Sequence, residues 1–479
     1  MMDLHTHDDA RTGRLRPVRI LAVALPVTVL ALSGFYAYPS LRARYHFHAA
    51  QIATERNDLA GEQQHLLECL KGWKTDPDIY LRTARVARRL GNFEEADRCL
   101  HQCARFHGNP SEVELERLFL NLDRRNPNLE PRIVLETLRR APEDHADLPE
   151  ALEKLSKSCL DDYRLQDALA ALTLWIERQP NGVQPLLLRG WVLEQLAPNP
   201  QPALPDYRRA VELEPDNDVV HLRLAEALVK TKQSAQALPE LEALQRRHPA
   251  SPVVLLNLSL CRADLGDSQE AAQLLDTLLS PQRLAQVQEL SERLRSDRPL
   301  PHEIEAADWY RQGMMQAPYG SRNQAHYVVD LYIQALVERA KLAARNKGDG
   351  AQFLRQAVKL DPFDYAANYQ LALCLEQRGE QAEARRLQTK LAEIRADQQR
   401  MSEAAAQVLG NPHDPAPRCI AAEILLRNGQ PQEAMRWLRG ALQENPNYPQ
   451  AVRLLTVYQR LRLQSNRAAT VGERKQTAP

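Results

Sequence analysis

The stretch AVELEPDN at residues 210–217 joins the end of an amphipathic segment to a proline. Related octets recur as AVKLDPFD at 357–364, ALQENPNY at 441–448 and, more loosely, WIERQPNG at 175–182. A small residue stands seven places before each octet: Ala203, Gly350, Ala434 and Ala168. Proline ends helices because it lacks the backbone N–H and clashes with the preceding turn. The repeat therefore predicts helix-turn-helix units that stack into a solenoid.

The composition of the chain favours an all-α fold. Its 479 residues are rich in Leu, Ala, Arg, Glu and Gln, which fill helices at low entropic cost, and only 5% are aromatic. Lys+Arg and Asp+Glu both number 62, so the formal net charge is zero. A protein that binds nucleic acid generally would show a clear basic excess, and we therefore expect no nucleic-acid partner.

The segment 415–448 carries the fullest version of the repeat. Its small, large and turn positions are Ala421, Ala422, Leu425, Gly429, Ala434, Leu438, Ala441 and Pro446. This pattern resembles the tetratricopeptide repeat (TPR) family, and the resemblance implies a right-handed α-solenoid of about ten TPR-like units. We place these units at 43–76, 77–110, 111–144, 149–182, 183–217, 218–251, 252–285, 331–364, 365–398 and 415–448.

The same frame assigns packing roles to particular side chains. Small residues are expected where the two helices of a unit cross most closely: Ala84, Ala96, Ala225, Ala237, Ala422 and Ala434. Larger residues are expected in the seam with the next unit: Leu100, Leu172, Leu241 and Leu438. No unit can bury its apolar face alone, so the array is stable only when stacked.

The repeat divides the chain into an N-terminal array at 43–285 and a C-terminal array at 331–463 that ends in a capping helix. Between them, residues 286–330 fit no unit and are predicted to form an irregular, aromatic-rich insertion. A long charged helix is expected to run up to Gly410, and the tail at 464–479 is expected to be disordered.

Residues 20–38, ILAVALPVTVLALSGFYAY, contain no charge and have the length of a transmembrane helix. Four arginines precede the segment (Arg11, Arg14, Arg16 and Arg19) and two follow it closely (Arg42 and Arg44). This bias predicts a single-pass protein with a cytoplasmic tail at 1–19 and an extracytoplasmic TPR domain, periplasmic if the protein is bacterial. A cleaved signal peptide ending near Ala31-Leu32-Ser33 is the alternative, and it also exports the repeats.

The first ten residues, MMDLHTHDDA, contain a D-x-H-x-H pattern at Asp3, His5 and His7. Metal-dependent hydrolases place such a pattern on a barrel strand, but here an arginine-rich tail and the uncharged segment follow it. We therefore interpret it as part of the tail.

Other candidate chemistry is sparse. Cys99, Cys103 and His107 are expected on one face of one helix, at intervals of four residues, which makes a zinc site conceivable. No C-x-x-C pair accompanies them, however, and five of the seven cysteines fall on packing positions. No phosphate-binding or nucleophile motif is present, so we predict a protein that is not an enzyme and has no cofactor or metal. Arg82, Arg85, Arg88 and Arg89 would form either a basic patch near the membrane or an ordinary solvated face.

The predicted function is therefore partner binding. In TPR arrays the first helix of each unit lines the concave groove, and this resemblance assigns the groove to Leu187, Trp191, Val219, Leu222, Val253, Leu256 and Leu260. Such an apolar strip suits an amphipathic helix or an extended segment of another protein. The alternative is that the strip packs against the chain's own 286–330 insertion, whose exposed surface we assign to Trp309, Tyr310 and Tyr319.

These observations together predict a membrane-anchored TPR scaffold in an envelope complex. Two alternatives remain open. The chain would be a non-catalytic accessory subunit of a membrane-associated enzyme, secretion or maturation system, or its repeats would lie in the cytoplasm with inverted topology.

Overall fold

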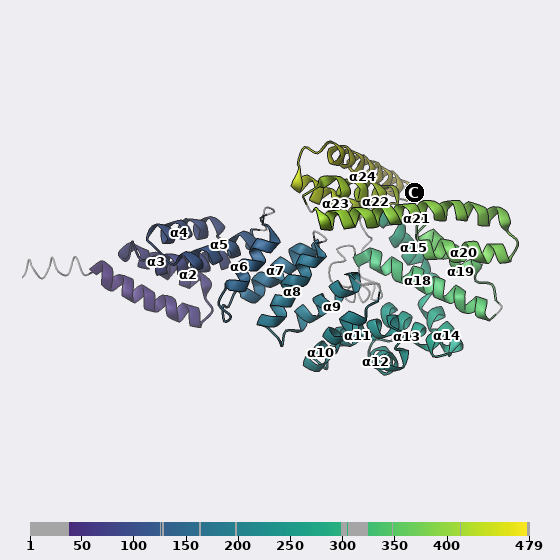
Figure 1. Cartoon of the computed structure of the whole chain (residues 1–479), viewed down its shortest axis with the longest axis horizontal. Helices are drawn as coiled ribbons and strands as arrows, with labels where there is room; N and C mark the ends of the chain where they lie inside the picture. Colours follow the sequence, from purple (N-terminus) through teal and green to yellow (C-terminus); the bar gives the residue numbers. More distant parts are fainter. Residues whose placement is uncertain are drawn as a thin grey trace, which may run out of the picture. The chain divides into compact units, whose positions relative to one another are not determined.

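The computed structural model describes residues 38–476, apart from 125, 127–128, 162–163, 197–198, 298–303, 305–323, 347 and 412. All regular structure among these residues is helical, and none of them lies in a strand. The chain divides into two compact units, Met1–Ala151 and Leu152–Pro479. Helices follow one another along each unit as antiparallel pairs (Figure 1).

The first unit begins with a helix over 38–55. It is followed by α2 (Leu59–Gly72), α3 (Pro77–Arg89), α4 (Phe93–Arg105), α5 (Pro110–Asp123) and α6 (Pro131–Arg140). The helix α7 (Leu148–Asp161) starts in this unit and continues across the boundary.

The second unit contains more pairs and three longer helices, of 22, 30 and 28 residues. Its first part comprises α8 (Leu165–Arg178), α9 (Val183–Leu196), η1 (Gln201–Ala203), α10 (Leu204–Leu213), α11 (Asp218–Lys230), α12 (Ser234–Arg247), α13 (Pro252–Asp264), α14 (Ser268–Leu278) and α15 (Pro281–Arg295). Its second part comprises α18 (Gln324–Arg345), α19 (Ala351–Leu360), α20 (Tyr365–Gln377), α21 (Gln381–Gly410), α22 (Pro415–Arg427), α23 (Pro431–Glu444) and α24 (Pro449–Gln476). The predicted unit ranges are matched only approximately, since the first helix begins at 38, α18 begins at Gln324 and α21 continues to Gly410.

Local sequence explains where the first helix of a pair begins. Asp76 caps α3 by accepting hydrogen bonds from the backbone N–H groups of Asp78 and Ile79, and proline occupies the first helical position. Asn109, Ser251 and Asp414 cap α5, α13 and α22 in the same way, each directly before a proline. A capping oxygen satisfies an N–H that has no partner within the helix, and proline has no N–H to lose there.

The turn inside six of the described pairs has a left-handed backbone. Gly91, Gly266, Gly379 and Gly429 have φ angles of 78°, 97°, 78° and 73° at this position. Glycine adopts such angles without the clash that a Cβ atom causes. At the equivalent position the first pair has Asn57 and the α11–α12 pair has Lys232, whose φ angles are 57° and 60°.

The packing predicted from the repeat frame is confirmed. The expected crossing residues are all buried, with exposed fractions of 1% or less, and so are Leu100, Leu172, Leu241 and Leu438. Small side chains at the crossings let two helix backbones approach closely, while the leucines fill the space between successive pairs.

A long-range closure links distant parts of the second unit. The carboxylate of Asp297, just after α15, accepts hydrogen bonds from the Tyr458 hydroxyl at 3.1 Å and from the Gln432 amide at 3.2 Å. The last repeat and α24 therefore pack against the end of α15, and this contact cannot be predicted from the spacing of the repeat.

Three expectations differ from the structure or lie outside it. The segment 286–330 is helical at both ends, because α15 includes 286–295 and α18 includes 324–330. The tail expected to be disordered from 464 is helical through Gln476 in α24. The expected transmembrane segment 20–38 lies outside the described residues except for Tyr38, and no helix between 38 and 476 that the structure describes has the length and apolar character to cross a membrane.

Candidate functional site

The predicted groove residues occupy different environments. Leu222, Val253 and Leu256 are buried in the largest core cluster, whereas Leu187 and Leu260 are partly buried against it. Trp191 is partly exposed and Val219 is exposed. The three buried residues therefore line no open groove, which corrects that part of the expected strip.

The residues that cover them come from α18 and the segment before it. Ile304, Val328 and Val329 belong to the same buried cluster as Leu222, Val253 and Leu256. The Tyr327 hydroxyl lies 3.4 Å from the Glu226 carboxylate of α11, and burial followed by that carboxylate raises the pKa of Tyr327. All four covering residues fall within 286–330, as in the alternative in which the strip packs against the chain itself. Trp309, Tyr310 and Tyr319 lie outside the described residues, so the binding role predicted for them stays a prediction.

The four arginines of α3 form neither a basic patch nor a uniformly solvated face. Arg88 is buried and bonded to Glu116, Asp123 and Asp147, and Arg89 also bonds Asp147 at 2.7 Å. Arg85 contacts Glu112 and Glu116, and Arg82 contacts Glu62. Each positive charge is therefore matched within the first unit.

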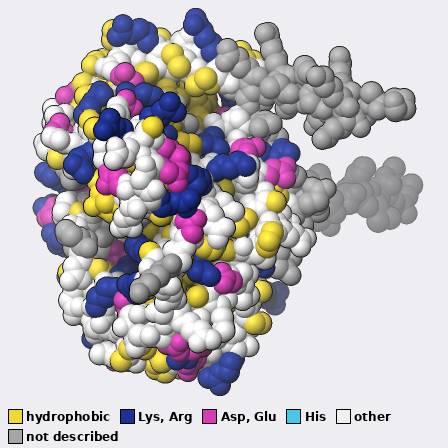
Figure 2. Space-filling model, turned by 90° about the vertical axis from the view of Figure 1, so that its right-hand side faces the viewer, with side chains coloured by type: hydrophobic (Ala, Val, Ile, Leu, Met, Phe, Trp, Pro, Cys, Tyr) yellow, Lys and Arg dark blue, Asp and Glu magenta, His cyan; other side chains and the backbone are white. Residues whose placement is uncertain are grey.

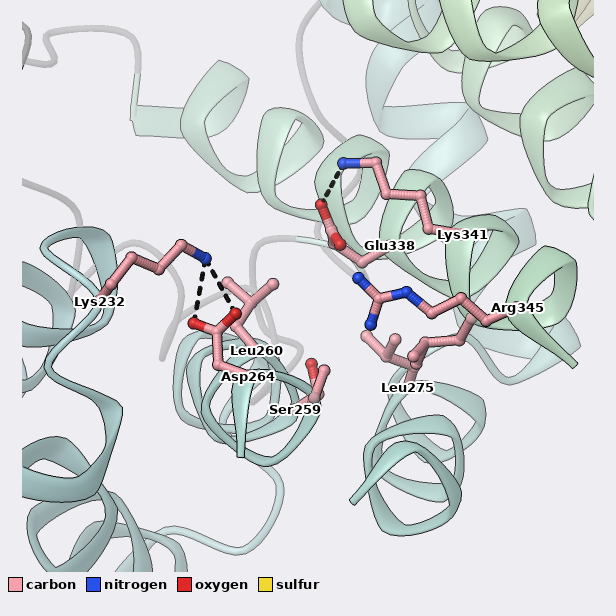
Figure 3. Close-up of a pocket in the computed structure, with 10 residues that line it drawn as sticks. Lys232, Ser259, Leu260, Asp264, Leu275, Glu338, Lys341 and Arg345 are labelled. Atoms are coloured by element: carbon pink, nitrogen blue, oxygen red, sulfur yellow. Dashed lines mark hydrogen bonds and ion pairs between the residues drawn. The ribbon is translucent and has the colours of Figure 1, made fainter. Parts of the chain in front are cut away.

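A pocket lies in the second unit, between α13, α14, α18 and the turn that joins α11 to α12 (Figure 3). Its volume is about 200 Å³. The pocket is lined by Lys232, Ser259, Leu260, Ala263, Asp264, Leu275, Glu338, Lys341, Leu342 and Arg345. Leu260 is the one predicted groove residue among them.

The charges of this pocket are unevenly paired. The Lys232 ammonium lies 2.9 and 3.0 Å from the two Asp264 oxygens, and the Lys341 ammonium lies 2.8 Å from Glu338. Arg345 lines the pocket from the last turn of α18 (Figure 3), and no hydrogen bond or ion pair joins it to any residue that the structure describes. Three cations thus face two carboxylates, which leaves one guanidinium available to an anionic group of a ligand.

The apolar part of the pocket lies beside these charges. Leu260 and Ala263 come from α13, Leu275 from α14 and Leu342 from α18. A side chain or short segment that combines a carboxylate with an apolar group would satisfy both parts.

Lys232 is held in an unfavourable backbone conformation at the edge of the pocket. Its φ angle of 60° places it in the left-handed region, where the equivalent turns of four other pairs have glycine. A non-glycine residue there costs on the order of 1 kcal/mol and is found disproportionately at functional sites. The strain is an independent reason to regard this pocket as functional.

A second exposed surface lies on α20. The rings of Tyr365 and Tyr369 stack with centroids 5.9 Å apart and planes 8° apart. Tyr369 is 41% exposed, and Leu373 one turn later is 37% exposed. Neither residue was expected in the groove, although Tyr369 and Leu373 occupy the same positions in their repeat as Leu256 and Leu260 do in theirs.

The Cys99, Cys103 and His107 set does not share a helix face. The helix α4 ends at Arg105, and His107 has a φ angle of 60°, so it lies in the turn. No group of three or more His, Cys, Asp or Glu residues in the described part of the chain is arranged to hold a metal ion.

Stacked antiparallel helix pairs with small residues at their crossings define an α-solenoid of helix-turn-helix repeats. Family models of the tetratricopeptide repeat match residues 199–251 and 339–398, so the chain contains tetratricopeptide repeats. Tetratricopeptide repeat proteins generally mediate protein–protein interaction or scaffolding. No curated protein sequence matches this chain.

Several solved structures share the helical repeat with low overall similarity. Residues 41 to the end of MamA from Desulfovibrio magneticus RS-1 are 18% identical, with a TM-score of 0.25, over 52% of this chain and 96% of that one. The human IFIT1 dimer with m7Gppp-AAAA is 14% identical, with a TM-score of 0.33, over 78% and 90%. Yeast Tom70 is 12% identical, with a TM-score of 0.27, over 91% and 99%. At this level the similarity carries no argument about function.

Proposed function

We propose that this chain is a membrane-anchored scaffold that holds a protein partner on the extracytoplasmic side of a membrane, in an envelope complex. The observation that carries partner binding is the pocket at α13, α14 and α18, where Arg345, which has no ion pair with a described residue, lines the same cavity as Leu260, Leu275 and Leu342. The uncharged run at 20–38 and the arginines before it support the anchor. Anchoring would raise the local concentration of whatever the repeats hold.

The partner is a protein segment that presents a carboxylate one or two residues from an apolar side chain. Lys341 and Arg345 lie one turn apart on α18, so an extended segment crossing this helix would meet both cations. The face shown in Figure 2 carries basic and acidic side chains interspersed with apolar ones. A surface of this kind lacks the continuous positive field that favours nucleic acid.

The test uses the full chain with a C-terminal tag in its own cells. A photoactivatable residue replaces Leu260 in the pocket, and a second strain carries it at Gln288 on α15 as the control. We expect one stoichiometric protein to crosslink from position 260 and not from position 288. A tag that recovers only the chain itself from position 260 would overturn the proposal.

A charge reversal then tests the pocket chemistry. Arg345→Glu should reduce recovery of the crosslinked partner at least tenfold, because two carboxylates would then meet. Arg385→Glu reverses an exposed arginine on α21 and should leave recovery unchanged. Equal losses for both variants would mean that general charge, rather than the pocket, controls binding.

The topology is tested separately by protease treatment of intact spheroplasts. Digestion of the repeats before lysis supports the anchor and the export of the second unit. Digestion only after lysis would contradict the localisation while leaving the partner experiment valid.

A further inference from the structure

The outward face of the helix over 38–55 carries a row of large apolar side chains. Tyr38, Leu41, Tyr45 and Ile52 are 62%, 60%, 70% and 36% exposed, and His48 between them is also exposed. We call these five residues the outer stripe. The opposite face of the same helix is buried through Ala43, Ala50 and Ala53.

An apolar end face is unexpected on a solenoid. The first and last repeats of such arrays need polar outer faces, since no further repeat covers them. A continuous row of exposed tyrosine, leucine and isoleucine therefore indicates that something covers the outer stripe.

The spacing of the outer stripe identifies the occupant. Its residues follow one another at intervals of three, four, three and four, the heptad spacing at which two helices wind around each other. An identical helix presents the same spacing, so the stripe is complementary to itself in a parallel pair.

The charges beside the outer stripe are compatible with a parallel pair. In a parallel pair, Arg44 of one copy would lie beside Ala49 of the other copy. Gln51 would lie beside Arg56 in the same way. No like charges meet along either flank. Arg42 is already paired with Glu68 of α2, at 2.9 Å.

The chain that precedes the stripe points to the same arrangement. Residues 1–37 lie outside the described part and join it at Tyr38, where the uncharged run ends. Two copies anchored through that run would enter the membrane in the same direction and bring their outer stripes side by side. This orientation rests on the proposed anchor, whereas the self-complementary spacing does not.

We propose that the outer stripe is a homodimer interface, in which the helices over 38–55 of two copies pair in parallel and in register. Dimerisation would place two partner-binding second units on one anchor pair, and so raise the avidity for a partner with two binding segments.

The first test is a disulfide between two copies of the full chain, purified in mild detergent and, separately, inserted in lipid vesicles. Tyr45→Cys places a thiol at the centre of the outer stripe, and Thr54→Cys places one on the same helix away from it. Six of the seven natural cysteines are buried and one is half-buried, so the unmodified chain supplies the baseline. We expect mild oxidation to yield a covalent dimer at least tenfold more abundantly from Tyr45→Cys than from Thr54→Cys.

The second test measures the mass of the chain by light scattering. The double variant Leu41→Glu, Tyr45→Glu should convert a dimer to a monomer, and Gln51→Glu, which adds one charge beside the stripe, should not. All these side chains are exposed, and circular dichroism should show unchanged helix content. A monomeric wild-type chain, or equal crosslinking from both cysteines, would overturn the proposal.

The outcome for Tyr45→Cys also identifies other occupants. If this thiol does not crosslink and is protected from maleimide only in vesicles, lipid covers the outer stripe. If it does not crosslink and is protected in detergent as well, the chain's own first 37 residues cover it. Either result would overturn the dimer without affecting the capture of a partner at Arg345.

Discussion

Arg88 and Glu116 form a buried ion pair between two successive repeats, with 2.6 Å between the Arg88 Nε and the Glu116 carboxylate and with side chains 3% and 1% exposed. The same guanidinium bonds Asp123 at 2.9 Å and also Asp147, and it lies 5.3 Å from the centre of the Phe119 ring. One arginine on α3 thereby ties together α5 and the chain just before α7. Burial by itself would lower the pKa of Arg88, but the attraction of the neighbouring carboxylates is stronger and raises it.

Removing the cation should therefore destabilise the first unit strongly. Arg88→Ala removes the buried cation and leaves Glu116 with Arg85 alone and Asp147 with Arg89 alone. Breaking a buried pair in this way typically costs about 3–5 kcal/mol. Urea unfolding of the full chain, followed by circular dichroism, would measure the loss. The control is Arg140→Ala, which breaks an exposed pair with Glu136 and should leave the midpoint unchanged. Similar effects from the two variants would show that the network around Arg88 stabilises no more than a surface pair.

The contacts of Arg88 also show which features of the structure can be predicted from the sequence and which cannot. Helix pairs and the burial of crossing residues such as Ala84 follow from local spacing, and the structure shows both. Arg88 stands among three other arginines on α3, and its acidic partners lie 28, 35 and 59 residues further along. The stacking of the repeats decides which arginine of such a group is buried, and the composition of the helix does not reveal how the repeats stack.

The pocket, too, could be predicted from the sequence only in part. Leu260, predicted for the groove, also lines this pocket, but the other wall comes from 338–345, beyond the segment that fits no repeat. The spacing placed a unit at 331–364, which contains most of α18, but it did not predict that the helix begins at Gln324 or that its first turns join the buried cluster of Leu222, Val253 and Leu256.

The strained turn at Lys232 gives a prediction with opposite effects on stability and binding. Lys232→Gly should stabilise the chain by up to about 1 kcal/mol, because glycine tolerates a φ of 60° without strain and an exposed pair with Asp264 contributes little. The same variant should weaken partner capture at the pocket. Gly266→Lys is the reciprocal control, since its added Cβ meets no atom within 4 Å and only the backbone is strained. We expect it to destabilise the chain by about 1 kcal/mol, and a stability gain there would contradict the argument.

His326, on α18, should make the second unit sensitive to acid. Burial lowers the pKa of His326 to about 4 from an ordinary value of 6.5, and neither ring nitrogen has a hydrogen-bond partner among the described residues. Between pH 6.5 and 4 the unfolded chain therefore binds a proton that the folded chain does not, and stability falls as the pH falls.

Replacing this histidine should remove part of that dependence. His326→Phe keeps a planar ring without unsatisfied nitrogens, so we expect a higher urea midpoint at pH 7 and a smaller drop from pH 7 to pH 5. His101→Gln, at an exposed histidine on α4, should leave both quantities as they are in the wild type. An unchanged drop in His326→Phe would mean that the acid sensitivity arises elsewhere.

The seven cysteines should differ in reactivity according to burial. Cys374 is the half-buried one, and the other six are buried. Burial raises the pKa of the Cys69 and Cys419 thiols to about 11 and that of Cys99 to about 12, so almost no thiolate is present at pH 8. The Cys261 thiol also donates a hydrogen bond to the Ser234 carbonyl at 3.0 Å. Brief labelling of the native chain with iodoacetamide, read by mass spectrometry, should modify Cys374 first and the other six only after addition of urea. Rapid native labelling of Cys103, Cys159 and Cys261 would contradict a packing role for these cysteines, because a reagent reaches a thiol at a helix crossing only when the pair opens.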